Sequence, residues 1–310
     1  MPTPNGYDTF VRVGKELVKI TVPDLSMPGS ITKQSLAAFK RQSDGLLAQA
    51  HEALDQECQC LAFSEETWQQ SWLPEIQAIR ELARGFAVQG YTAHMNSEDN
   101  KAIECYLATV RMGKASSRGG LYIDALVGIA CEGIGLNHLH DLQTSLSEEQ
   151  LLELAQTLCS MQELNEPLEV IAARDEVADY YICGWVGRLQ LMLEKISQPD
   201  DLFSKKLMGI ALQRRQSQYQ ILLIEIALTR YHNKHGIYPQ KLDALVPDFL
   251  GELPKEPHGA DGFIYRLKET QSNVTNQPPY ELYSPGPNLL DDGGNPNTTN
   301  NSFDDISFSR

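Results

Sequence analysis

The feature that most constrains this chain is a change of residue pattern after Gly236. Before it, apolar residues recur at helical spacing, first over 30–197 and again over 203–235. After it, Pro, Gly and Asn interrupt every segment, and only short stretches with strand-like composition remain. Helical spacing followed by strand signals predicts an α+β protein. At 310 residues the chain is long enough for two ordinary domains.

Domain boundaries follow from the composition. Pro199-Asp200-Asp201 interrupts the helical pattern. We therefore expect an N-terminal arm with a short helix at 1–29 and an all-helical domain at 30–200. Because no repeat period is found, that domain is predicted to be a bundle or a helical-hairpin array. Residues 201–310 are predicted to form a long helix docked on a small antiparallel sheet.

Capping residues predict where several elements begin and end. Ser30, Ser64 and Ser97 precede helical patterns as N-caps do, and Ser147 with Gln150 forms the pattern of a capping box. Gly236 is expected to end the long helix. Two or three short strands are expected beyond it, at Phe263–Leu267, Tyr280–Tyr283 and Ile306–Phe308.

Charge and hydropathy exclude some classes of protein. The net charge is -15 and no Lys/Arg cluster occurs, so binding of nucleic acid is not expected. No run approaches the roughly 20 apolar residues of a membrane span, and the start lacks a signal-peptide pattern. The protein is thus either cytoplasmic, or it carries a membrane anchor upstream of the given sequence.

The six cysteines do not form a metal or redox motif. None lies in a C-x-x-C pair, and Cys58 and Cys60 are too close to bridge each other comfortably. The others lie among apolar helical residues, where a cysteine usually acts as a small hydrophobe; these are Cys105, Cys131, Cys159 and Cys183. Disulfides between helices are the alternative.

One polar cluster could carry catalysis. Glu132, His138, His140 and Asp141 lie in an otherwise apolar stretch, and His138 and Asp141 are one helical turn apart. A hydrolase would need a pocket that gathers Glu132, His138 and Asp141. We favour a structural role for them, since no nucleophile, phosphate-loop or zinc-protease motif occurs. The nearby glycines at 128, 133 and 135 indicate close helix packing.

The C-terminal third carries a succession of family features. The helix end at 227–239, with Ala-Leu, a Tyr, a Gly and then Tyr-Pro, is followed by the short-helix pattern at 241–246. Pro254–Pro257, the two strand segments and the acidic segment from Asp291 follow in the same order. This succession resembles the soluble domain of type II secretion major pseudopilins. The whole chain also resembles uncharacterised bacterial envelope proteins that join a helical region to such a tail.

The resemblance implies a calcium ion that fastens the closing loop to the sheet. The oxygen ligands it implies are Ser284, Asn288, Asp291, Asp292, Asp304 and Asp305. Asn288 stands where the family has an aspartate, so weaker binding is expected. The alternative is a solvated, Asn-rich tail. The membrane-embedded start of the family's helix is replaced here by soluble helix, which does not support the family's usual polymerisation.

From these features we expect a non-enzymatic interaction or scaffolding protein of the bacterial cell envelope. It would act outside the cytoplasm, with protein partners and no nucleic acid. Two alternatives are an intracellular helical-repeat adaptor and a hydrolase that uses Glu132, His138 and Asp141.

Overall fold

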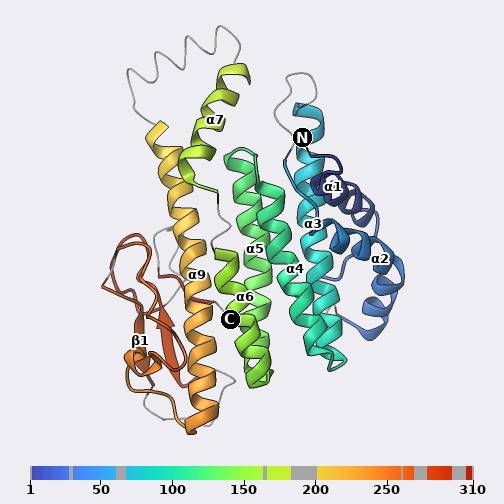
Figure 1. The fold of residues 1–310 in the computed structure, drawn as a ribbon. Helices are drawn as coiled ribbons and strands as arrows, with labels where there is room; N and C mark the ends of the chain where they lie inside the picture. Colours follow the sequence, from blue (N-terminus) through green and yellow to red (C-terminus); the bar gives the residue numbers. More distant parts are fainter. Residues whose placement is uncertain are drawn as a thin grey trace. The chain divides into compact units, whose positions relative to one another are not determined.

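The computed structural model describes residues 2–27, 31–60, 68–162, 166–182, 201–259, 261–268, 278–294 and 305–308. The described chain is mostly helical and carries one two-stranded antiparallel sheet, so the α+β class is confirmed (Figure 1). Within the described residues, no helix is both long and apolar enough to span a bilayer.

The chain forms two compact units. Unit 1 comprises residues 1–139 and 164–209, and unit 2 comprises residues 140–163 and 210–310. Unit 2 thus includes residues 140–163, which the predicted boundary near residue 200 assigns to the helical domain. These residues belong to unit 2 because they pair with the long helix. A change in local composition does not reveal such long-range pairing.

Unit 1 is built from helices. They are α1 (Gly6–Leu17), α2 (Lys33–Ala53), α3 (Trp68–Met95), α4 (Asp99–Ser117), α5 (Tyr122–Leu142) as far as Leu139, α7 (Leu168–Ile182) and the first residues of α9 (Asp201–His235). α1 begins at the N-cap Asn5, whose side-chain oxygen accepts from the Tyr7 amide. Its apolar face, with Phe10 and Val13 fully buried, packs on α2 and α3.

Small residues allow close helix crossings in unit 1. A Cβ added at Gly14 of α1 would lie 2.1 Å from the Ala78 carbonyl oxygen of α3. Where α4 crosses α5, a Cβ at Gly113 would lie 2.6 Å from the Gly128 carbonyl oxygen. Gly135 makes a similar approach to α4, whereas Gly133 has open space around it. The prediction of glycine-mediated packing is thus confirmed at two of the three glycines and wrong at Gly133.

In unit 2, α6 (Glu148–Gln162) runs antiparallel to α9 (Figure 1). Arg230 near the end of α9 contacts Glu148 at the start of α6, with Nε and Oε1 2.6 Å apart. Gln216, earlier on α9, donates to Gln162 at the far end of α6. The capping box is confirmed, because the Gln150 amide donates to the Ser147 hydroxyl while the Ser147 amide donates to the Gln150 side chain.

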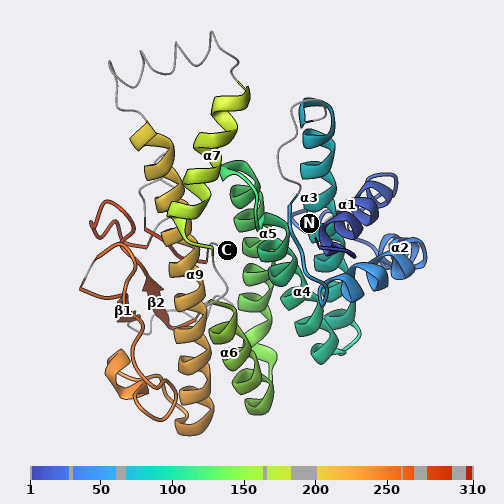
Figure 2. The ribbon, with the colours of Figure 1, turned by 45° about the horizontal axis from the view of Figure 1, so that its top comes forward.

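The sheet of unit 2 lies beside α9 (Figure 2). β1 (Ile264–Leu267) pairs antiparallel with β2 (Tyr280–Tyr283), in register Ile264 with Tyr283 and Leu267 with Tyr280. Because side chains alternate between faces, one face carries Tyr265, Leu267, Tyr280 and Leu282. That face packs in one apolar cluster with Ile221, Ile224, Ala227 and Leu228 of α9.

Several predicted boundaries need correction. Ile306 forms only an isolated bridge with Ser284, so the third strand predicted at 306–308 is wrong for the described residues. The short helix after the long one is a 3-10 turn, η3 (Leu242–Leu245). α4 takes Glu98 rather than Ser97 as its N-cap residue. α2 takes Thr32, and Ser30 and Ser64 lie outside the described residues.

Candidate functional site

The candidate site is the acidic loop that follows β2. The face of the sheet turned away from α9 carries Ile264, Arg266, Glu281 and Tyr283, by the alternation of the strands. Residues 284–294 cover part of this face, and a Cβ added at Gly294 would lie 2.8 Å from the Tyr283 ring. Gly294 has φ +71°, a conformation that favours glycine, so this close approach depends on the residue type.

Asp291 attaches the loop to the sheet. Its carboxylate forms an ion pair with the Arg266 guanidinium and accepts from the Tyr283 hydroxyl at 2.6 Å. It also accepts from the Gly293 amide at 3.1 Å. The hydrogen bond from Tyr283, followed by that from Arg266, lowers the pKa of Asp291, while burial and the same contact raise the pKa of Tyr283. Asp291 is therefore held as a carboxylate by partners within the chain.

Ser284 is fully buried where β2 ends. Its amide donates to the Ile306 carbonyl at 3.0 Å, and the Ile306 amide donates back to the Ser284 carbonyl at 2.8 Å. The Ser284 hydroxyl donates to Glu256 Oε1 at 2.6 Å and accepts from the Gly286 amide. The Ser284 side chain therefore joins the 254–257 segment to the loop, and its backbone joins the loop to the last described segment.

Asn288 and Asp292 form a second link within the loop. The Asn288 amide nitrogen donates to Asp292 Oδ2 at 2.9 Å, and its oxygen accepts from the Leu290 amide. The oxygen that a metal would need from Asn288 is thus used by the backbone. The Asn288 side chain is half-buried, and that of Asp292 is solvent-exposed.

Asp305 differs from the other acids of the loop because it is buried. One oxygen, Oδ2, accepts from the Gly294 amide at 2.7 Å, and Oδ1 is buried without a hydrogen-bond partner among the described residues. Burial raises the pKa of Asp305, and repulsion from Asp292 and Asp291 raises it further, against the Gly294 contact. A buried carboxylate with one unsatisfied oxygen and acidic neighbours is the arrangement that a cation would stabilise.

The loop fits the implied calcium ion in part. The carboxylates of Asp305 and Asp292 repel each other, so a cation would stabilise both. Backbone carbonyls are further oxygen donors. Asp291 is bound to Arg266 and Tyr283, and Asp304 lies outside the described residues. Among the described residues, no three His, Cys, Asp or Glu side chains are grouped as a metal site requires.

A buried polar network lies beside the end of this loop. His140 Nδ1 and Glu225 Oε2 are 2.6 Å apart, and both side chains are almost fully buried. Gln143 donates to the same Glu225 oxygen and accepts from the Thr229 hydroxyl. The His140 ring stacks on Phe308 with centroids 4.5 Å apart. The network therefore joins the α5 end, α9 and the last described segment.

The structure gives the four residues of the predicted polar cluster different surroundings. Glu132 pairs with Lys114 at 3.3 Å, with both side chains buried. The half-buried His138 stacks on Tyr106 of α4, and Asp141 is exposed. Along α5 the described contacts thus do not bring Glu132, His138 and Asp141 together in one pocket.

A second group of ionisable side chains surrounds the start of α5 in unit 1. The Tyr7 hydroxyl donates to Glu75 at 3.3 Å, and Asp124 accepts from the Leu121 amide at 2.8 Å. Burial raises the pKa of Asp124, and repulsion from Glu75 and Asp175 adds to it. Arg174 supplies positive charge nearby while it forms a two-fold contact with Glu166. This group connects α1, α3, α5 and α7 and has the character of a structural network.

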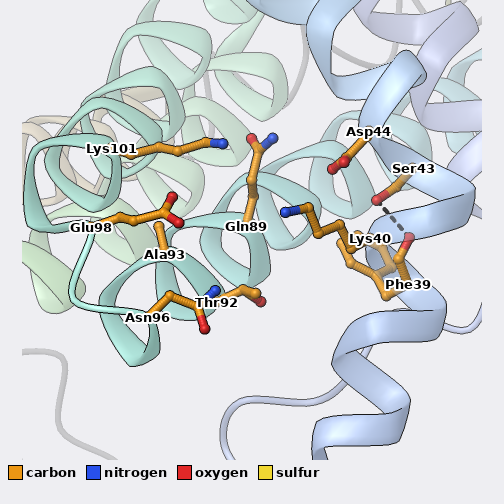
Figure 3. A pocket seen from close by; sticks show the side chains of 10 residues that line it. All are labelled: Phe39, Lys40, Ser43, Asp44, Gln89, Thr92, Ala93, Asn96, Glu98 and Lys101. Carbon is orange, nitrogen blue, oxygen red and sulfur yellow. Dashed lines mark hydrogen bonds between the residues drawn. The ribbon is translucent and has the colours of Figure 1, made fainter.

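A recess between α2, α3 and α4 is too small to bind a substrate. Figure 3 shows Lys40 from α2 and Lys101 from α4 pointing toward Gln89 of α3. The cavity volume is about 20 Å³, enough for roughly one water molecule. Gln89 already accepts from the Cys105 thiol.

The cysteines act mostly as predicted. The five described cysteines are not in disulfides, and Cys58, Cys60, Cys105 and Cys131 are buried. Burial raises the pKa of Cys105 and Cys131 to about 12, so these thiols stay protonated and unreactive. The prediction is wrong for Cys159, which is exposed, and Cys183 lies outside the described residues.

Sequence patterns missed the residues that fix the loop and the network. Arg266 and Glu256 lie outside the acidic segment, so composition does not link them to it. Glu225 did leave a signal, since it is the single charged residue of the apolar run 221–228. Such a residue must be paired when it is buried.

Comparison of the chain with models of protein families, with curated proteins and with solved structures finds no match.

Proposed function

We propose that this protein is a non-enzymatic interaction or scaffolding protein of the bacterial cell envelope, with a pseudopilin-like C-terminal domain. One observation carries the proposal. A long helix packs its apolar side on a small antiparallel sheet, and an acidic loop covers the opposite face of that sheet. The elements follow the order in which the family has them, namely helix, short helical turn, two strands and closing loop.

The end of α9 supports the same proposal. Gly236 adopts φ +75° directly after the helix, and its amide donates to the His232 carbonyl at 2.7 Å. Tyr238 then packs against Tyr280 of β2, with ring centroids 5.1 Å apart. The Tyr265 hydroxyl donates to the Pro239 carbonyl at 2.8 Å. The Gly-x-Tyr-Pro turn thereby directs the chain from the helix back to the sheet.

The contacts of the acidic side chains and the net charge both favour an interaction role. Apart from Asp305, the described acids of the loop are paired or solvated, and their contacts include Arg266, Tyr283 and backbone amides. The acidic net charge favours soluble protein partners over an anionic membrane surface. Location outside the cytoplasm is part of the proposal, because calcium is abundant there.

Calcium binding at the closing loop provides the test. We expect calcium to raise the Tm by several degrees relative to a chelator, because it would bind the folded loop and not the unfolded chain. Asp305→Asn should abolish this rise. In chelator the variant should be at least as stable as the wild type, since the buried charge and its repulsion from Asp292 are removed. Differential scanning calorimetry at neutral pH measures both effects.

The pH dependence of folding stability, measured in chelator, provides a second test of the role of Asp305. Because the folded-state pKa of Asp305 is raised, folding is favoured by protonation, and this contribution is present below about pH 4. The wild type should lose this stability as the pH rises through the raised pKa of Asp305. Asp305→Asn should not show this loss. Asp291→Asn is the control, because it should lower the Tm with and without calcium by breaking the Arg266 contact. A wild-type Tm that is equal in calcium and chelator would contradict the calcium site and favour the adaptor alternative.

A further inference from the structure

The last described segment, residues 305–308, brings Asp305 to the closing loop. Asp305 Oδ2 accepts from the Gly294 amide at 2.7 Å, and the two residues are 11 positions apart in the sequence. Ile306 exchanges two backbone hydrogen bonds with Ser284 at the end of β2, and its side chain is 1% exposed. We call residues 305–308 the closing segment. Its contacts must place Asp305, because a chain of 11 residues can span anything up to roughly 36 Å.

Burial of Asp305 opposes this placement. The residue is fully buried, and its Oδ1 has no hydrogen-bond partner among the described residues. A buried charge without full compensation favours a conformation in which the carboxylate reaches water. Repulsion from Asp292 and Asp291 acts in the same direction. Other contacts of the closing segment therefore have to hold it in place.

Phe308 supplies such a contact at the end of the closing segment. Its ring lies nearly parallel to that of His140, with 10° between the planes and 4.5 Å between the centroids. Phe308 is half-buried and also packs against the apolar cluster of α9 and the sheet. An aliphatic side chain could keep the apolar packing but could not reproduce the contact between two flat rings.

Hydrogen bonds fix the His140 ring on which Phe308 lies. His140 Nδ1 is 2.6 Å from Glu225 Oε2 of α9, and the two side chains are 9% and 7% exposed. Gln143 donates to the same Glu225 oxygen at 3.4 Å and accepts from Thr229 of α9 at 3.2 Å. Because these buried groups hold one another, the ring is kept in one orientation. The end of α5 therefore offers Phe308 a preformed surface.

We propose that the stack of Phe308 on His140 positions Asp305 in the closing loop. With the stack made, the closing segment is seated and Asp305 reaches the Gly294 amide. With the stack broken, the buried charge favours release of the segment, and the hydrogen bonds to Gly294 and Ser284 open together. The use of the seated Asp305 by calcium rests on the proposed function, whereas the seat itself does not.

Hydrogen exchange of single amides, followed by NMR in chelator at constant pH, tests the proposal. Phe308→Leu keeps an apolar side chain but removes the stack, so the Gly294 and Ile306 amides should exchange about three- to tenfold faster. Both should accelerate by the same factor, because they open in one step. The Gly293 amide should not change, since it donates to Asp291 within the loop.

Two matched variants separate positioning from a general loss of stability. Phe249→Leu makes the same substitution at another half-buried ring that packs against the same apolar cluster. It should leave the exchange of the Gly294 and Ile306 amides unchanged. Phe308→Tyr retains an aromatic ring at the stack and should exchange like the wild type at both amides.

A double-mutant cycle identifies the contact through which Phe308 acts. His140→Gln removes the ring but keeps a hydrogen-bond donor for Glu225, and it should accelerate the same two amides as Phe308→Leu does. The double variant should exchange no faster than either single variant, because each substitution removes the same stack. Accelerations that multiply in the double variant would contradict a shared contact and overturn the proposal.

The remaining outcomes are equally decisive. Unchanged exchange at Gly294 in Phe308→Leu would overturn the proposal, and so would equal acceleration at Gly293 and Gly294, which would show a general loosening of the loop. Calcium added to the wild type should slow exchange at Gly294 and Ile306, because the ion binds the seated segment. If calcium changes neither exchange nor Tm while Phe308→Leu gives the expected acceleration, the calcium site fails and the seat of Asp305 stands.

Discussion

Gly14→Ala is expected to destabilise unit 1 by about 3 kcal/mol or more, which corresponds to a fall in Tm of about 6–12 °C. The added Cβ would lie 2.1 Å from the Ala78 carbonyl oxygen and 2.5 Å from its carbonyl carbon. These are backbone atoms within α3, so no side-chain rotation can relieve the clash. α1 would have to move away from α3 and expose part of the core around Phe10 and Val13.

Gly45→Ala is the matched control for this prediction. Gly45 lies inside α2, is exposed, and has no atom within 4 Å of an added Cβ. The same substitution there should stabilise the protein by about 0.5–1 kcal/mol, because alanine favours the helix. Urea denaturation followed by circular dichroism measures both variants. A Gly14→Ala variant as stable as wild type would mean that α1 and α3 do not cross this closely.

The local part of the fold could be predicted from the sequence because its signals are local. The capping box at Ser147 and Gln150 and the stop at Gly236 each depend on residues within one helical turn. β2 was predicted at its observed bounds, since its aromatic and apolar residues have strand-like character. The strand predicted at Ile306 was wrong because apolar residues do not ensure pairing over more than one residue.

The candidate site was harder to predict because its contacts are long-range. Asp291 was expected to be a metal ligand, whereas it pairs with Arg266, which is 25 residues away in sequence. His140 was grouped with its sequence neighbours, but its described partner Glu225 is 85 residues away. A pattern can indicate that a buried charge needs a partner, but only the packing of elements selects which residue that partner is.

Glu132→Gln is the second substitution with a large expected effect. Glu132 is fully buried and its Oε2 lies 3.3 Å from the Lys114 ammonium nitrogen, which is itself 8% exposed. Removing the carboxylate charge leaves a buried ammonium group without this compensation. We expect the free energy of unfolding to fall by about 3–5 kcal/mol, measured by urea denaturation.

The pair also distinguishes a structural Glu132 from the catalytic one that a hydrolase would need. If the carboxylate serves only to neutralise Lys114, the double substitution Lys114→Met/Glu132→Leu should recover most of the lost stability, because it removes both charges and fills the site with apolar groups. Lys114→Met alone should be destabilising by a similar amount to Glu132→Gln. Loss of stability that the double substitution does not recover would contradict this account, since Glu132 would then be held by other contacts that the charge-free pair cannot replace.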